Sequence, residues 1–194
     1  MKTPTRPSQG RIEELERAVA ESPDSAQAHY RLGTALIQAA IWARGESELR
    51  RAVDLDSDYC EAWVNLGGVL LSRWDFAGSV EANRRAAAGR PTLAVAHYNQ
   101  GLGHLYLGQA AEMATCFRRV VELEPGNAGG HYHLAVGLLA LGESEAARQS
   151  LAWAMELGYS PQPELLKALE REKETESEAA VFEFSPAPRD DSKS

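Results

Sequence analysis

Four consecutive segments of 34 residues align along this chain without an insertion or a deletion. They are 26–59, 60–93, 94–127 and 128–161. When the first residue of each segment is counted as position 1, position 8 is small in every segment: Gly33, Gly67, Gly101 and Ala135. A fixed period of this length is typical of stacked supersecondary units, none of which buries its apolar side without a neighbour. The repeat therefore predicts a solenoid and excludes most enzyme architectures.

Each segment contains two amphipathic helical patterns joined by a short break. In the second segment the first pattern places Trp63, Leu66 and Leu70 on one face at i, i+3 and i+7. Glycine and polar residues favour turns, and the breaks expected within the segments are Gly45, Trp74-Asp75, Gly108 and Gly142. The sequence thus predicts four antiparallel helix pairs and an all-α fold.

The regions on either side of the repeats predict capping elements. Residues 11–23 have the pattern of a single capping helix before the first pair, and residues 162–176 have that of a second capping helix after the last. Polar outer helices are what a solenoid needs at its open ends. Residues 1–10 and the acidic stretch 177–194 have no helical period, so we expect both to be disordered.

Composition narrows the class of partner. The chain has a net charge of −8 and no cluster of lysine or arginine, so it has no electrostatic footprint for nucleic acid. Cys60 and Cys116 show no metal-site spacing, which indicates a reducing compartment. No apolar run is long enough for a signal-peptide core or a membrane helix. We expect a cytoplasmic protein that does not insert into membranes.

The motif W-x2-L-G-x2-L at Trp63–Leu70, with Met113-x3-Phe117 and Pro125 at later offsets, resembles the tetratricopeptide repeat. The resemblance covers 26–161, and the polar Asn83 at position 24 departs from it. It implies a right-handed α-solenoid whose leading helices line a concave groove for peptides or partner helices. It also implies a protein without enzymatic activity or cofactor.

Helical geometry selects the residues that should face this groove. Positions 2, 6, 9 and 13 lie opposite the packed face of each leading helix. Position 6 forms a polar ladder, and an asparagine there offers both a donor and an acceptor to a ligand backbone. The alternative is that these amides only hydrate an exposed face. The predicted partner-binding residues are Arg31, Thr34, Gln38, Asn65, Ser72, Val95, Asn99, Leu102, Tyr106, His133 and Val136.

Other chemistry finds little support in the sequence. A carboxylate clamp would need a cation at position 2, where the chain has Gln27, Glu61, Val95 and Gly129. The histidines fall mainly at packed positions, and no carboxylate or cysteine completes a metal set. No serine or cysteine has an obvious base and orienting partner. The sequence predicts neither a metal site nor a catalytic residue, and it attributes the four tryptophans to packing.

Three functions remain open. The first is a scaffold or adaptor that binds a peptide or helix of a partner in the groove. The second is a chaperone or assembly factor that shields a secreted or membrane-complex client. The third is self-assembly into a homo-oligomer, in which solenoids stack end to end or dimerise through Val95, Leu102 and Val136.

The apolar cluster of Val181, Phe182 and Phe184 raises a further hypothesis. These residues could occupy the groove of their own or a neighbouring molecule, in competition with the partner. The alternative is a solvated chain end in which the aromatic residues have no binding role.

Overall fold

The computed structural model describes residues 7–171, and within this range the chain is helical with no strand. Nine helices are labelled, and a further helix runs from residue 163 to residue 171. The labelled helices are α1 (Gln9–Glu21), α2 (Ala26–Gln38), α3 (Trp42–Leu55), α4 (Cys60–Ser72), α5 (Phe76–Gly89), α6 (Ala94–Tyr106), α7 (Ala110–Leu123), α8 (Ala128–Ala140) and α9 (Ser144–Glu156).

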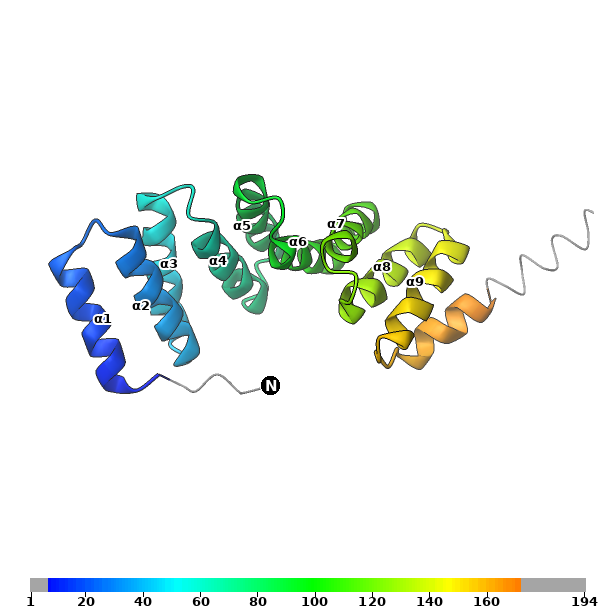
Figure 1. Cartoon of the computed structure of the whole chain (residues 1–194), viewed down its shortest axis with the longest axis horizontal. Coiled ribbons are helices and arrows are strands. Elements are labelled where there is room, and N and C mark those ends of the chain that lie inside the picture. The colour runs from blue at the N-terminus through cyan, green and yellow to red at the C-terminus, as the bar shows by residue number, and fades with distance from the viewer. Residues whose placement is uncertain (1–6, 172–194) are drawn as a thin grey trace, which may run out of the picture.

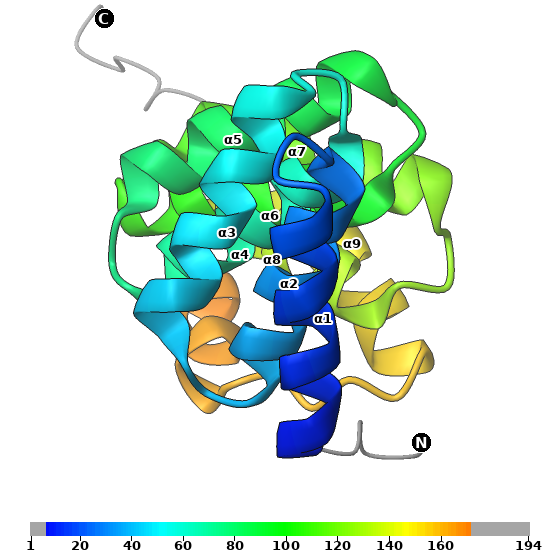
Figure 2. The same cartoon turned by 90° about the vertical axis from the view of Figure 1, so that its left-hand side faces the viewer.

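These helices form a solenoid in which each antiparallel pair stacks on the next (Figure 1). The leading helices α2, α4, α6 and α8 begin at the first residue of each 34-residue segment, and the trailing helices are α3, α5, α7 and α9. Seen from the end of α1, the later pairs lie behind one another along the stack (Figure 2). Within residues 7–171, no helix combines the length and the apolar character needed to cross a bilayer.

Small residues at position 8 allow the two helices of a pair to approach closely. A Cβ added to Gly33 would lie 3.0 Å from the Gly45 carbonyl oxygen and 3.0 Å from Leu49 Cγ. A Cβ added to Gly101 would lie 2.8 Å from the Phe117 ring. Position 8 therefore sets the spacing between leading and trailing helices. The turn expected at Gly45 is wrong, because Gly45 is buried within α3 at this contact.

Position 4 joins each leading helix to the turn before it. The Trp63 indole donates from Nε1 to the Ser57 carbonyl at 2.8 Å. Histidine Nε2 atoms make the same bond to the carbonyl six residues earlier, from His29 to Pro23, His97 to Pro91 and His131 to Pro125, at 2.9, 3.0 and 2.9 Å. Because a carbonyl only accepts, each of these histidines carries a proton on Nε2. Tryptophan and histidine at position 4 thus donate the same hydrogen bond.

The turn within each pair contains one residue in the left-handed region. Its φ is 70° at Gly108 and 77° at Gly142, where glycine adopts this conformation without strain. The equivalent residues Ala40 and Trp74 have φ of 64° and 66°. For a residue with a Cβ this conformation costs roughly 1–2 kcal/mol. Trp74 is the bulkiest side chain that the fold holds in this way.

Asn83 interrupts the otherwise apolar packing at position 24. Leu49, Phe117 and Leu151 occupy this position in the other pairs, and all four side chains are buried. Asn83 Nδ2 donates to the Ser79 carbonyl at 2.9 Å, but Asn83 Oδ1 has no hydrogen-bond partner among residues 7–171. A buried acceptor without a partner loses its hydration and gains nothing in return. Asn83 is therefore a weak point in the core of the second pair.

We expect Asn83→Leu to raise the free energy of unfolding by about 1–3 kcal/mol, because leucine has a similar shape and leaves no unpaired oxygen. Urea unfolding followed by circular dichroism measures the change. The matched variant Leu49→Asn places the same amide in the first pair and should lower stability. A loss of stability in Asn83→Leu would contradict this account of the core.

Candidate functional site

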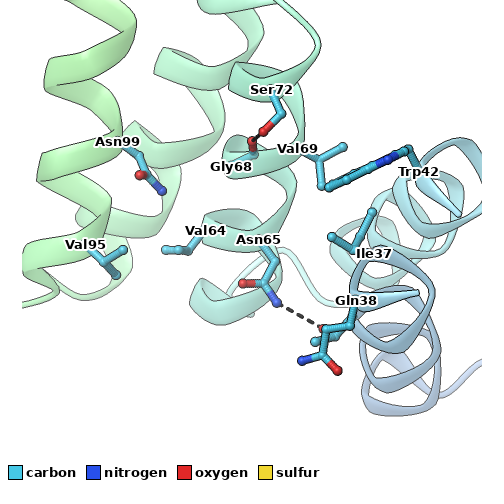
Figure 3. Close-up of a pocket in the computed structure, with 11 residues that line it drawn as sticks. Ile37, Gln38, Trp42, Val64, Asn65, Gly68, Val69, Ser72, Val95 and Asn99 are labelled. Carbon is cyan, nitrogen blue, oxygen red and sulfur yellow. Dashed lines mark hydrogen bonds between the residues drawn. The ribbon is translucent and has the colours of Figure 1, made fainter. Parts of the chain in front are cut away.

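Three leading helices line an open pocket of about 400 Å³. Side chains of α2, α4 and α6 point toward it, together with the first residue of α3 (Figure 3). We call it the central pocket. Its lining residues are Thr34, Ile37, Gln38, Trp42, Val64, Asn65, Gly68, Val69, Ser72, Val95 and Asn99.

Several predicted binding residues come together in this pocket. Because repeated positions stack from one leading helix to the next, residues far apart in sequence become neighbours. The predicted residues in the lining are Thr34, Gln38, Asn65, Ser72, Val95 and Asn99.

The pocket combines polar groups with apolar walls and contains no charge. Asn65 Nδ2 donates to Thr34 Oγ1 at 3.0 Å, which holds the amide in place across two repeats. This bond leaves Asn65 Oδ1 and a second N–H for a ligand. Ile37, Val64 and Val69 supply apolar surface, and none of the described lining residues is charged. Such a site suits an apolar side chain flanked by backbone amides.

Trp42 belongs to this site, although sequence reasoning assigned it to packing. It is the first residue of α3, and its exposed ring lines the pocket next to Val69 (Figure 3). Trp63, by contrast, does pack within the fold, with Arg85 5.1 Å above its ring. The sequence feature that could have identified Trp42 is its position, because it lies at the turn within a pair, where a trailing helix begins.

A second aromatic surface lies at the ends of α4 and α6. The rings of Phe76 and Tyr106 stack at 4.6 Å, and the Trp74 ring contacts both, at 5.9 and 6.3 Å. We call these three residues the aromatic ledge. Tyr106 lies two helical turns beyond Asn99 on the same face of α6, so the ledge and the central pocket share that face of the helix. Trp74 is 75% exposed, so burial does not offset its backbone strain.

The remaining predicted residues lie elsewhere. Arg31 is exposed on α2 and does not line the central pocket. Leu102 and Val136 are half-buried and pack against the core around Phe117. Tyr106 is exposed on the ledge. Val181, Phe182 and Phe184 lie outside the described residues.

The structure places His133 in the interface between repeats. Its ring stacks on Phe117 at 4.9 Å and meets Tyr98 edge-on. His133 Nδ1 is buried without a partner among residues 7–171, and burial lowers the pKa of His133 to about 4. The expected polar ladder Arg31–Asn65–Asn99–His133 therefore does not continue as an open row through the fourth pair. The cause is the large Phe117 ring, which reaches toward α8.

The described residues offer little for metal or covalent chemistry. Residues 7–171 contain no group of three or more histidine, cysteine or acidic side chains that could hold a metal ion. Cys60 and Cys116 are free and buried. Burial raises the pKa of the Cys116 thiol to about 11, so its nucleophilic thiolate form is disfavoured.

Comparison with known proteins gives a family match. The tetratricopeptide repeat model matches residues 12–59 and 98–154, which together are more than half of the chain. A search of the curated proteins gives no match.

Solved structures of MamA share the fold. "Crystal structure of MamA" superposes with a TM-score of 0.72 at 20% identity, over 76% of this chain and 86% of that one. MamA 41-end from Desulfovibrio magneticus RS-1 gives 0.70 at 20% identity, over 77% and 84%. MamA AMB-1 gives 0.68 at 21%, over 76% and 90%. At this identity the likeness concerns the fold alone, and it confirms the predicted right-handed all-α solenoid.

His133 should make stability depend on pH. Its pKa is about 4 in the folded chain and 6.5 when unperturbed, so below pH 6.5 the unfolded state binds a proton that the folded state does not. The contribution of this ring should fall by about 2–3 kcal/mol between pH 7 and pH 4. Urea unfolding should show that His133→Phe loses less stability than wild type over this window. Equal losses of stability in both proteins would contradict the assignment of this pH dependence to His133.

Proposed function

Because the chain belongs to the tetratricopeptide repeat family, we propose that it is a non-enzymatic adaptor that binds an uncharged segment of a protein partner. The observation that carries this proposal is the central pocket, in which three leading helices bring amides and apolar side chains together without charge. Fold likeness to MamA supports the solenoid architecture and leaves the partner to be identified.

The proposed binding mode follows from the spacing of the amides. Asn65 and Asn99 are one repeat apart, and both line the pocket. A ligand backbone that crosses α4 and α6 would pair with them whatever its sequence, while one apolar side chain enters between Ile37, Val64 and Val69. Packed helices present these groups before binding, so most of the ordering cost would fall on the ligand.

We assign the protein to the cytoplasm. Two free thiols, both buried, are consistent with a reducing compartment.

The double variant Asn65→Ala/Asn99→Ala should weaken peptide binding by about 10- to 100-fold, because two backbone-pairing amides are lost. The probe is a library of random peptides displayed on phage and selected on the wild-type chain. Fluorescence titration of the selected peptides then gives the dissociation constants.

The matched control is Gln149→Ala/Gln162→Ala, which removes two exposed amides that do not line the central pocket. It should bind the selected peptides as wild type does. If the groove variant binds equally well, the central pocket is not the partner site.

Trp74→Gly tests whether the aromatic ledge belongs to the same site. Glycine removes the cost of the left-handed conformation, roughly 1–2 kcal/mol. The same change loses ring contacts worth about 0.5–1.5 kcal/mol. Because the two effects oppose each other, the free energy of unfolding should stay close to that of wild type. Peptide affinity should nevertheless fall, because an exposed tryptophan is a typical hot spot. Titration and urea unfolding of the same variant separate the two effects. Unchanged affinity would restrict the site to the central pocket.

A further inference from the structure

The last trailing helix and the helix 163–171 leave an apolar crease between them. It has a volume of about 300 Å³, and Met155 at its edge is 48% exposed. We call it the C-terminal crease. Its lining residues are Arg148, Leu151, Ala152, Met155, Leu166, Leu169 and Glu170.

The same crease near the start of the solenoid has a third wall, although a hollow of about 520 Å³ remains there. There it lies between α3 and α4, and Gly78, Ala82 and other residues of the following trailing helix α5 line it. Val53, three repeat periods before Met155, is 5% exposed. At the C-terminal crease the described residues supply no such third wall, because no trailing helix follows the helix 163–171 within residues 7–171.

The helix 163–171 has the place of a fifth leading helix. Its seventh residue, Leu169, is buried like Leu134, the seventh residue of α8. Leu165 and Leu166 pack against the same core, and Arg148 Nη1 donates to the Leu169 carbonyl at 3.3 Å. Each of the leading helices α2, α4, α6 and α8 is followed by a trailing partner.

The sequence beyond residue 171 contains the start of such a partner. The pentapeptide Glu-Ser-Glu-Ala-Ala occurs at 143–147, where α9 begins, and again at 176–180. The residues that α9 buries first are Ser144, Ala147 and Leu151. Their counterparts at the same spacing are Ser177, Ala180 and Phe184. Phenylalanine also occupies this position in α7, as the fully buried Phe117.

We propose that residues 177–185, where we expected disorder, form a short fifth trailing helix that packs into the C-terminal crease of their own molecule. Ser177, Ala180, Val181 and Phe184 share one face of that helix, at i, i+3, i+4 and i+7. Pro186 ends it, because proline lacks the N–H that the helix needs.

The connecting chain has a suitable length. Residues 172–176 lie between the end of the described chain and the proposed helix, whereas three residues join α2 to α3. Connections of two to about eight residues are usual between antiparallel helices. A docking site next to the end of the described chain therefore favours the segment's own molecule over a second copy. It also favours this crease over the central pocket, which lies on α2, α4 and α6.

Cysteine labelling at the crease tests the proposal. Met155→Cys places an exposed thiol at its edge, and the native Cys60 and Cys116 are buried. In the full chain a maleimide should label residue 155 about tenfold more slowly than in a chain truncated after residue 175, because the helix must open first. Truncation should also lower Tm by about 4–8 °C through the loss of apolar burial.

Two point variants of the full chain give a matched pair. Phe184→Ser should restore fast labelling, whereas Phe182→Ser should leave it slow, because Phe182 lies on the opposite face of a helix. In an extended segment both rings would point to the same side, and both variants would behave alike.

Three results would overturn the proposal. The first is equal labelling of the full and truncated chains, and the second is an equal effect of the two phenylalanine variants. The third is protection of residue 155 from the maleimide that increases with protein concentration, because a second copy of the chain would then occupy the crease. Peptide binding at the central pocket is measured separately, so failure here leaves the proposed function intact.

Discussion

The close contact between position 8 of each leading helix and position 24 of its partner governs the whole solenoid. Where position 8 has no side chain, Leu49, Asn83 and Phe117 reach the surface of the leading helix. This contact fixes the side of each leading helix that meets its trailing partner. The residues on the opposite side are then the ones that face the groove. The chemistry of the central pocket thus depends on glycines that no ligand needs to touch.

Sequence periodicity was sufficient to predict the helix pairs and much of the pocket. Asn65 and Asn99 line it as expected, because position 6 lies opposite the packed face. His133 differs because its surroundings depend on the size of a residue in another helix, Phe117, which periodicity does not describe. Gly45 differs because glycine favours both turns and close helix contacts, and only the packing decides between them.

Sequence periodicity likewise does not predict the roles of the aromatic residues at the surface. Trp63 and Trp42 have the same side chain, yet one donates to a turn carbonyl and the other lines the central pocket. Their roles depend on place within the pair: position 4 faces the preceding turn, whereas Trp42 at the start of α3 borders the central pocket. Trp74 adds a case in which the fold tolerates backbone strain for an exposed ring.

The absence of charge among the described residues of the central pocket has a kinetic consequence. Electrostatic steering accelerates encounters between oppositely charged surfaces, and dissolved salt weakens that acceleration. A pocket without charge gives an incoming chain no such guidance. The lining itself then adds no dependence of the association rate on ionic strength. Discrimination between partners would reside mainly in how long each one stays bound.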